Sequence, residues 1–186
     1  MPDGTVRVMK RAAKGGFTFR KPATDDGTAI HELIARCRPL DENSIYCNLL
    51  QCSHFADTCV VAEEGGEIRG FVSGYIVPDA RERLFIWQVA VAPEARGNSL
   101  GRRMILEILN RPEQGDITEL HTSITPDNKP SQGVFSSVAD FLDADVEQKV
   151  LFHEDDHFDG QQKTEILWEI GPFDMEEADR PLEDVA

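Results

Sequence analysis

A hydrophobic strand that runs into a basic, glycine-containing loop and then into a helix is the feature that most restricts how this chain can fold. Residues 84–91 (LFIWQVAV) form an apolar run that Pro93 ends. A short loop with arginine and glycine follows at 96–101, and residues 101–110 (GRRMILEILN) show helical periodicity. The inward positions of that helix are Met104, Ile105, Ile108 and Leu109. A strand followed at once by a helix predicts an α/β fold.

The rest of the chain alternates in the same way. Strands are expected at 17–20, 59–63, 68–77, 118–125, 146–152 and 163–170. Helices are expected from a cap at 24–26 up to Pro39, from about residue 43 with Tyr46, Leu49 and Leu50 buried, and at 128–141. The turn at 64–67 predicts a hairpin, and the last two strands are expected to pair antiparallel. This order predicts a mixed, mostly antiparallel central sheet flanked by helices.

One domain is predicted for residues 17–172. A chain of this size buries roughly 70% of the surface that it exposes when unfolded, so its core needs no disulfide or metal. Residues 1–16 are polar with scattered lysine and arginine and predict a flexible arm, whereas the acidic, proline-interrupted residues 173–186 predict a poorly ordered tail. No apolar run reaches the ~18 residues of a membrane span and no signal peptide is visible, which predicts a cytoplasmic protein.

Charge and cysteine spacing argue against two kinds of site. The net charge of −15 leaves no basic stripe for a nucleic acid backbone, although it suits a small cationic substrate or a salty cytoplasm. Cys37, Cys47, Cys52 and Cys59 contain no C-x-x-C pair, and Cys52 with His54 has no second pair to complete a zinc site. We therefore expect reduced, mostly buried thiols and no metal.

The loop at 96–101 has the chemistry of an anion site. The first turn of a helix leaves backbone N–H groups without partners, and the helix dipole adds positive charge there. Gly97 and Gly101 let the backbone approach a diphosphate, and Arg96, Arg102 and Arg103 add charge to an acidic protein. A glycine-containing connection with a solvated basic helix start would explain the same residues without a ligand. The Rossmann spacing of glycines and the Walker lysine are both absent.

The spacing Val89-x-Val91-x-Pro93-x-x-Arg96-Gly97-x-x-Leu100-Gly101 resembles the acetyl-CoA motif of the GCN5-related N-acetyltransferase superfamily, with Ser99 where glycine is usual. The resemblance implies that acetyl-CoA is the co-substrate, that the loop binds its diphosphate, and that the preceding strand pairs with its pantetheine arm and faces the thioester carbonyl. The residues implied in cofactor binding are Val89, Val91, Arg96, Gly97, Asn98, Ser99, Gly101, Arg102, Asn128 and Ser131. Many members carry a proton-donating tyrosine at the position of Phe135, and a phenyl ring cannot donate a proton.

A closer resemblance covers most of residues 19–172. Four blocks, at 39–46, 49–55, 58–63 and 85–89, are similar in order and spacing to the diaminobutyrate acetyltransferases of ectoine biosynthesis. This resemblance implies acetyl transfer to the γ-amine of L-2,4-diaminobutyrate, with N4-acetyl-L-2,4-diaminobutyrate as product, and it implies a homodimer. An N-acetyltransferase of another small amine or of a peptide, and a non-enzymatic CoA-binding module, stay open as alternatives.

A diamine that also carries a carboxylate calls for acidic side chains and hydrogen-bond donors. Asp41 is a candidate for binding the substrate, and its alternative role is a helix N-cap. Tyr46 and Trp87 are candidates for the same site or plain core aromatics. Further candidate polar contacts are Asn43, Ser44 and Gln88.

Glu165, in the last predicted strand, is the candidate for holding or deprotonating the reacting amine. An amine with a lysine-like pKa of about 10.4 must lose its proton before it attacks, which costs about 4–5 kcal/mol at neutral pH. The resemblance implies a histidine and further acids just before this position, where the chain has 162–164 (QKT). A solvated strand carboxylate is the alternative for Glu165, and His153, His157 and the acids at 154–156 are interpreted mainly as a loop.

Overall fold

The computed structural model describes residues 16–175, so the predicted arm, apart from Gly16, and the tail beyond Met175 lie outside the described residues. The strands are β1 (Thr18–Arg20), β2 (Val60–Glu64), β3 (Glu67–Val77), β4 (Ala80–Val91), β5 (Glu119–Ile124), β6 (Val146–Phe152) and β7 (Glu165–Ile170). The helices are α1 (Gly27–Arg36), α2 (Ile45–Ser53), α3 (Leu100–Leu109), α4 (Lys129–Leu142) and α5 (Glu154–Phe158). No helix between residues 16 and 175 has the length and apolarity needed to cross a membrane.

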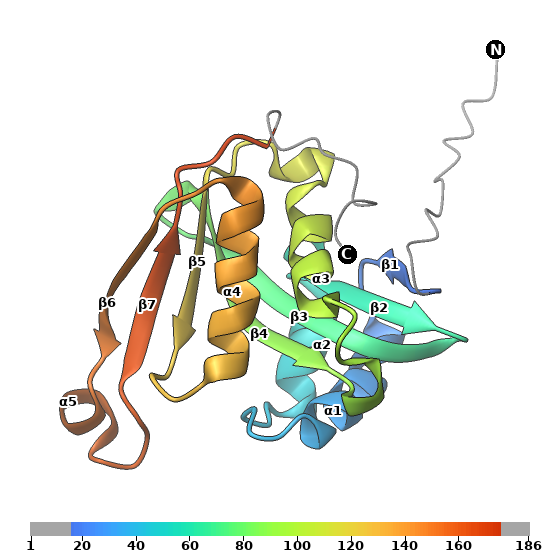
Figure 1. The fold of residues 1–186 in the computed structure, drawn as a ribbon. Coiled ribbons are helices and arrows are strands. Elements are labelled where there is room, and N and C mark those ends of the chain that lie inside the picture. The colour runs from blue at the N-terminus through green and yellow to red at the C-terminus, as the bar shows by residue number, and fades with distance from the viewer. Residues whose placement is uncertain (1–15, 176–186) are drawn as a thin grey trace.

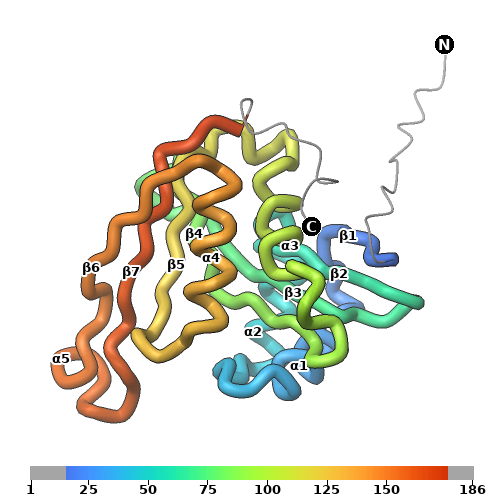
Figure 2. The backbone as a smooth tube through the Cα atoms, in the orientation of Figure 1, coloured from blue at the N-terminus to red at the C-terminus, as the bar shows by residue number. Residues whose placement is uncertain are grey.

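Within the described residues, seven strands form one sheet in the order β1-β2-β3-β4-β5-β7-β6. Neighbouring strands run antiparallel, except for the parallel pair β4 and β5. Helices α3 and α4 cover one face of the sheet and α1 and α2 cover the other (Figure 1). Figure 2 shows the same layers as a backbone tube. The predicted mixed, mostly antiparallel sheet flanked by helices is confirmed.

Strands β4 and β5 stay together for only part of their length. Their pairs run from Arg83 with Glu119 to Ile86 with Thr122, whose hydroxyl donates to the Ile86 carbonyl at 3.0 Å. Strand β4 continues to Val91 without a β5 partner, and Figure 1 shows the two strands separating toward their C-terminal ends. The middle of the sheet therefore contains a stretch of strand edge that β5 does not cover.

A β-bulge in β4 accounts for this separation. On β3 the consecutive residues Ser73 and Gly74 pair with Gln88 and Ile86, so Trp87 is an extra residue on β4. A bulge bends its strand and increases the local twist, which turns the end of β4 away from β5. Glycine is required beside the bulge, because a Cβ on residue 74 would lie 2.7 Å from the backbone oxygen of residue 85.

Helix α3 is fixed firmly against the sheet. The predicted inward residues Met104, Ile105, Ile108 and Leu109 are at most 2% exposed. The helix also comes close to β3, since a Cβ on Gly70 would lie 2.8 Å from the Met104 sulfur. This packing sets the position of the loop that precedes α3.

Helix α2 presents a different face to the core from the one predicted. Its buried residues are Asn48, Gln51 and Cys52. Tyr46 is 71% exposed, and the other two predicted core residues, at 49 and 50, are half-buried. The Asn48 amide donates to the Gln51 side chain at 3.1 Å, which replaces part of the hydrogen bonding to water that burial removes. Assigning the buried face from apolar residues alone was therefore wrong.

The segment around residue 155, predicted as a loop, contains the short helix α5. His153 caps it: the Nδ1 of His153 accepts from the Asp155 N–H at 3.3 Å, and the His153 N–H donates to the Nδ1 of His157 at 3.0 Å. Histidine is not among the preferred capping residues, so the pattern gives no helix signal. Both histidines serve the local structure of α5.

The packed domain continues past its predicted end at residue 172, as far as Met175, which is partly buried against the core. Phe173 is 6% exposed, and its N–H donates to the Thr118 carbonyl at 2.9 Å. The first helix ends at Arg36, a few residues before Pro39. Both differences are shifts at the ends of elements, where residue patterns are least informative.

Candidate active site

The uncovered edge of β4 carries the backbone groups of Val89 and Val91. The N–H of Ala92 donates to the Arg69 carbonyl on β3 at 2.8 Å. Since the hydrogen-bonding direction alternates along a strand, Val91 and Val89 face the opposite edge, where β5 does not pair. The Val91 carbonyl accepts a bond from the Cys37 thiol there at 3.3 Å. The Val89 segment can therefore take an extended ligand in the manner of an added strand.

The loop between β4 and α3 makes a left-handed bend. A 3-10 turn at Pro93–Ala95 leads into it, and the Asn98 side chain donates to the Ala95 carbonyl at 3.1 Å. Gly97 has φ +83° and Ser99 has φ +50°. Glycine adopts this region freely, whereas any other residue there is disfavoured by roughly 1–2 kcal/mol. This backbone requirement explains why glycine is the usual residue at the position of Ser99.

The start of α3 points hydrogen-bond donors into the same space. The Arg103 N–H donates to the Ser99 carbonyl at 3.0 Å. The N–H groups of Leu100, Gly101 and Arg102 precede this bond and find no acceptor within the helix. They carry the partial positive charge of the helix N-terminus, so the loop and the first turn together can bind a diphosphate.

Gly101 also brings α3 close to its neighbours. A Cβ on Gly101 would lie 3.3 Å from side-chain carbons of Val89 and Val134. The absence of a side chain lets the N-terminus of α3 lie beside both β4 and α4. The donors of the loop therefore lie next to the uncovered strand edge.

The three arginines of this region differ in position. Arg96 is exposed and Arg102 is half-buried. Arg103 is 8% exposed, and its guanidinium lies 5.7 Å and 5.2 Å from the ring centroids of Phe17 and Phe19. Arg103 therefore ties β1 to α3 through cation–π contacts. The expectation that it adds charge to the loop was wrong.

Asn128 and Ser131 form the start of α4. The Asn128 side-chain oxygen accepts from the Ser131 N–H at 3.2 Å and caps the helix. Phe135, about one turn further along, is 3% exposed and belongs to the core. The cap fixes the backbone of the first turn of α4.

The loop between α1 and α2 carries several candidate substrate residues to β4. Gln88 is 8% exposed, its Nε2 donates to the Asp41 carbonyl at 2.9 Å, and its Oε1 accepts from the Asn43 amide at 3.2 Å. Ser44 caps α2 by accepting from the Cys47 N–H at 3.2 Å. The interpretation of Asp41 as a helix cap was therefore wrong, and Asp41 is exposed.

The two candidate aromatic residues lie on the surface. Trp87, the extra residue of the bulge, is 50% exposed, and Tyr46 is 71% exposed. The interpretation of these residues as core aromatics was wrong for both. Their rings are available to a ligand.

Glu165 adds a second carboxylate to the site of Asp41. Burial raises the pKa of the Glu165 carboxyl, a hydrogen bond from the Ser123 hydroxyl lowers it, and the Asp41 carboxylate raises it. Two acids far apart in the sequence therefore interact, and Glu165 is not a fully solvated strand carboxylate. Such a pair suits binding and deprotonation of an ammonium group. The sequence analysis did not identify Ser123. The alternation of side chains between the two faces of β5 could have indicated on which face of the sheet Ser123 lies.

The cysteines contribute to packing. Cys37, Cys52 and Cys59 are buried free thiols, and burial raises the pKa of Cys52 to about 11 and that of Cys59 to about 12. Thiols with such pKa values are protonated at neutral pH and are poor nucleophiles. Between residues 16 and 175, no group of three or more His, Cys, Asp or Glu side chains is arranged to hold a metal ion.

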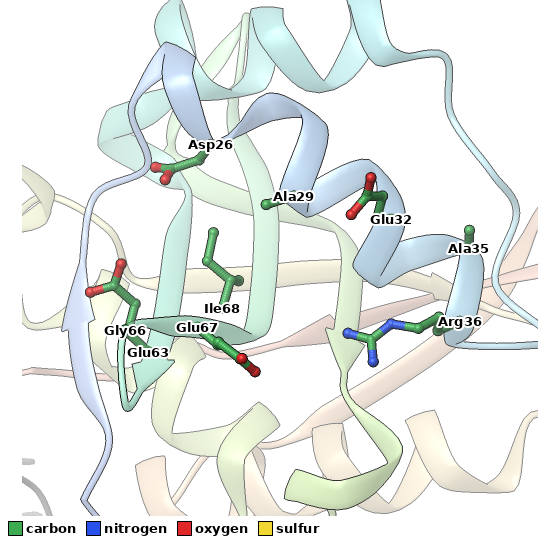
Figure 3. A pocket seen from close by; sticks show the side chains of 9 residues that line it. All are labelled: Asp26, Ala29, Glu32, Ala35, Arg36, Glu63, Gly66, Glu67 and Ile68. Atoms are coloured by element: carbon green, nitrogen blue, oxygen red, sulfur yellow. The ribbon is translucent and has the colours of Figure 1, made fainter.

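A cavity of about 630 Å³ lies away from these residues, between α1 and the β2–β3 hairpin (Figure 3). Two of its acids, Asp26 and Glu63, pair with Arg20 at 2.7 Å and 2.5 Å. None of the predicted site residues lines this cavity. We therefore take the uncovered edge of β4, with the carboxylates of Asp41 and Glu165, as the candidate active site.

Comparison with known sequences gives a match over most of the chain. The profile of the Acetyltransferase (GNAT) family matches residues 27–141. L-2,4-diaminobutyric acid acetyltransferase from Methylotuvimicrobium alcaliphilum is 47% identical over 173 residues, which cover 93% of this chain and 96% of the relative. The protein of the same name from Halomonas elongata is 45% identical over 160 residues, which cover 86% of this chain and 83% of the relative.

Solved structures match in fold as well. Diaminobutyrate acetyltransferase from Paenibacillus lautus, in complex with its substrate L-2,4-diaminobutyric acid and coenzyme A, superposes with a TM-score of 0.81 at 34% identity. The match covers 84% of this chain and 95% of that one. The loading GNATL domain of CurA from Lyngbya majuscula shares the fold, with a TM-score of 0.65 at 13% identity.

The loop geometry predicts opposite sensitivities at Ser99 and Gly101. Ser99→Gly relieves a left-handed serine, so the free energy of unfolding should stay unchanged or rise by up to about 1 kcal/mol, with coenzyme A affinity retained. Gly101→Ala places a methyl group 3.3 Å from two valines and displaces the donors of α3, so the dissociation constant for coenzyme A should rise at least about tenfold. Isothermal titration calorimetry measures both affinities. Equal affinities in two folded variants would contradict the assignment of this loop.

Proposed function

Because the chain belongs to the GNAT family of acetyltransferases and, within it, to the L-2,4-diaminobutyric acid acetyltransferases, we propose that it transfers the acetyl group of acetyl-CoA to the γ-amine of L-2,4-diaminobutyrate. The product is N4-acetyl-L-2,4-diaminobutyrate, an intermediate of ectoine biosynthesis. The match to these acetyltransferases over 93% of the chain carries the proposal. The raised pKa of Glu165, to which burial contributes most and the Asp41 carboxylate also contributes, supports an acidic site for a diamine.

We propose that acetyl-CoA lies along the uncovered edge of β4. The backbone N–H groups of the loop and of the first turn of α3 receive its diphosphate, and Arg96 and Arg102 add positive charge. Val89 and Val91 pair with the pantetheine arm, and Asn128 and Ser131 contact the cofactor from the start of α4. The remaining residues of this proposed site are Gly97, Asn98, Ser99 and Gly101. When bound, acetyl-CoA supplies an acetyl group activated as a thioester.

Glu165 is the proposed base for the reacting amine. The raised pKa of Glu165 makes its carboxylate a stronger base than an ordinary glutamate, which narrows the gap to the γ-ammonium group. Asp41 faces the second ammonium group of the diamine. Tyr46 and Trp87 offer apolar surface to the aliphatic part of the substrate, and Ser44 offers a hydroxyl group.

The backbone of β4 is proposed to stabilise the charge that develops on the thioester oxygen. The Val89 N–H faces the uncovered edge just beyond the bulge, and a fixed donor at this place stabilises an oxyanion more than it stabilises the ground state. Phe135 supplies packing and no proton. We therefore assign no residue to the protonation of the leaving thiolate.

Substrate preference tests this function directly. Release of free thiol from acetyl-CoA should be fastest with L-2,4-diaminobutyrate, slower with ornithine and lysine, and absent with a peptide amine, because the two acids of the site suit a short diamine. A thiol reagent follows the rate. Turnover of the peptide alone would favour a peptide N-acetyltransferase, and binding of coenzyme A without any turnover would favour a non-enzymatic module.

Replacement of Glu165 tests the proton transfer. Glu165→Gln should lower kcat at pH 7 by about a hundredfold or more, because no side chain then accepts the ammonium proton. The loss should shrink toward pH 9.5, where more of the amine is already neutral. Rates are measured with acetyl-CoA saturating, and an equal fractional loss at both pH values would show that Glu165 is not the base.

Ser123→Ala is the matched control for the titration of Glu165. Wild-type kcat/KM falls with decreasing pH as Glu165 takes up a proton. The Ser123 hydrogen bond lowers the pKa of Glu165, so its removal raises that pKa and moves the acidic limb of kcat/KM to higher pH. The rate on the alkaline side of this limb should be retained.

We also propose a homodimer that pairs through the edge strand β6, and a cytoplasmic location. In an antiparallel self-pairing centred on Gln148, Val146 would face Val150 of the second copy, and Glu147 would face Lys149 of the second copy. Val146 and Val150 are 37% and 55% exposed. Exposed apolar side chains on an edge strand favour pairing with another chain, and proteins usually avoid them there. The free buried thiols suit a reducing compartment.

Light scattering after size exclusion tests the dimer. Wild type should have twice the chain mass of 20.8 kDa. Val150→Lys should have the mass of one chain, because it places a charged side chain opposite Val146 of the second copy, and a lysine on an edge strand opposes edge-to-edge pairing. Asp140→Lys, on an exposed position of α4, is the control and should keep the dimer. A dimeric Val150→Lys protein would exclude pairing through β6.

A further inference from the structure

Gln88 is a buried amide with both of its ends bonded to one loop. It is 8% exposed, its Nε2 donates to the Asp41 carbonyl at 2.9 Å, and its Oε1 accepts from the Asn43 Nδ2 at 3.2 Å. A buried amide whose N–H and oxygen both bond to protein groups holds the two segments together, here β4 and the loop between α1 and α2. These bonds use one N–H and one lone pair of the amide, and they hold it against the loop.

The bulge aims this amide at the loop. Trp87 is inserted between two paired residues of β4, Ile86 and Gln88, so the side-chain alternation of the strand shifts by one residue. Val89 then lies against α3, close to Gly101, while Gln88 reaches the loop between α1 and α2 on the other face of the sheet. The insertion that uncovers the edge of β4 thus also directs Gln88 at the loop.

The loop has few other attachments near Asp41. Its beginning is held where the Cys37 thiol donates to the Val91 carbonyl at 3.3 Å and where Leu40 packs against the core. The pair of Arg38 with Glu42, at 2.7 Å, is exposed and local, so it fixes the loop weakly relative to the sheet. Among these ties, the Gln88 amide is the one that bonds to Asp41 itself.

The opposite side of the site is held independently. Glu165 begins β7, in the part of the sheet that lies beyond the separation from β4, and it accepts a hydrogen bond from Ser123 of β5. One carboxylate therefore belongs to the β5–β7 side and the other to a loop tied to β4. The spacing between the two carboxylates depends on how closely that loop is held to β4.

We propose that Gln88 is a positioning residue that sets the spacing between the Asp41 and Glu165 carboxylates, and thereby selects the length of the diamine. The inference rests on the proposed function and deepens it. In 2,4-diaminobutyrate three carbons separate the two nitrogens, whereas ornithine and lysine are longer by one and two methylene groups. A loop held by two hydrogen bonds favours the short diamine, and a loosened loop accepts longer ones.

A cycle of variants tests this proposal. Gln88→Met keeps the volume and removes both bonds; we expect the KM for diaminobutyrate to rise about three- to tenfold, with the KM for acetyl-CoA unchanged. Its preference for diaminobutyrate over ornithine, as a ratio of kcat/KM values, should fall at least threefold.

Asp41→Asn should raise the KM for diaminobutyrate about ten- to a hundredfold. Since Gln88 acts through Asp41, Gln88→Met with Asp41→Asn should be no worse than Asp41→Asn alone.

The pH profile supplies a readout that loss of packing would not move. If Asp41 shifts away from Glu165, the pKa of Glu165 falls, so the acidic limb of kcat/KM should move to lower pH in Gln88→Met and in Asp41→Asn alike. Asn43→Ala removes one bond without touching β4 and should give smaller changes in the same direction. This variant decides the question if Gln88→Met fails to fold, as a melting curve would show.

Three results would overturn the proposal. Additive losses in the double variant would mean that Gln88 contacts the substrate directly, and an unchanged preference against ornithine would mean that it does not set the spacing. An equal rise in the KM for acetyl-CoA would mean general damage. Failure of the proposed function is distinguishable, since wild type would then release no thiol with diaminobutyrate.

Discussion

The β-bulge at Trp87 adds one residue to β4, and the candidate site depends on how this bulge changes the pairing and direction of the strand. Before it, β4 is paired on both edges; beyond it, the strand bends away from β5 and exposes the backbone of Val89. The same shift turns Gln88 toward the loop that carries Asp41. A glycine at position 74 makes room for the bulge, because a Cβ there would collide with backbone atoms. The uncovered strand edge and the bond from Gln88 to the Asp41 loop thus have one local cause.

The elements predicted well from sequence are those in which apolar spacing and packing agree. Met104 and Ile108 repeat at helical spacing, and both are fully buried in α3. Helix α2 shows the opposite case: Tyr46 is exposed and residues 49 and 50 are half-buried, whereas the amides of Asn48 and Gln51 are buried and bond to each other. Apolar periodicity cannot reveal a buried polar face of this kind, in which one hydrogen bond joins the two amides while Asn48 Oδ1 and Gln51 Nε2 have no partner among the described residues.

The sequence suggested which residues are candidates for the site from their side-chain chemistry. It did not predict which other residues each of them contacts. The exposure of Trp87 follows from a register shift between two strands, and no single-strand pattern contains that shift. The interaction of Asp41 with Glu165 joins segments from opposite ends of the domain. The left-handed backbone at Ser99 could not be predicted from the sequence either, because this conformation is usually adopted by glycine and serine does not indicate it. Tertiary geometry decides each of these features.

Charges within the molecule are separated in a way that the net value of −15 conceals. Backbone donors and Arg96 gather at the start of α3, where a diphosphate is favoured. Carboxylates gather at Asp41 and Glu165, where a cation is favoured. An anion and a cation are therefore favoured at different ends of the uncovered strand edge.

The uncovered edge of β4 has a further consequence for how the molecule behaves between turnovers. A ligand that pairs with Val89 and Val91 adds backbone hydrogen bonds between the two parts of the sheet, which otherwise meet along the short β4–β5 ladder. A ligand bound in this way would act as a transient strand, and its departure would remove those bonds. Since a ligand that binds only the folded chain stabilises it, a ligand that filled this gap would slow local opening of the sheet and raise the resistance of the chain to proteolysis.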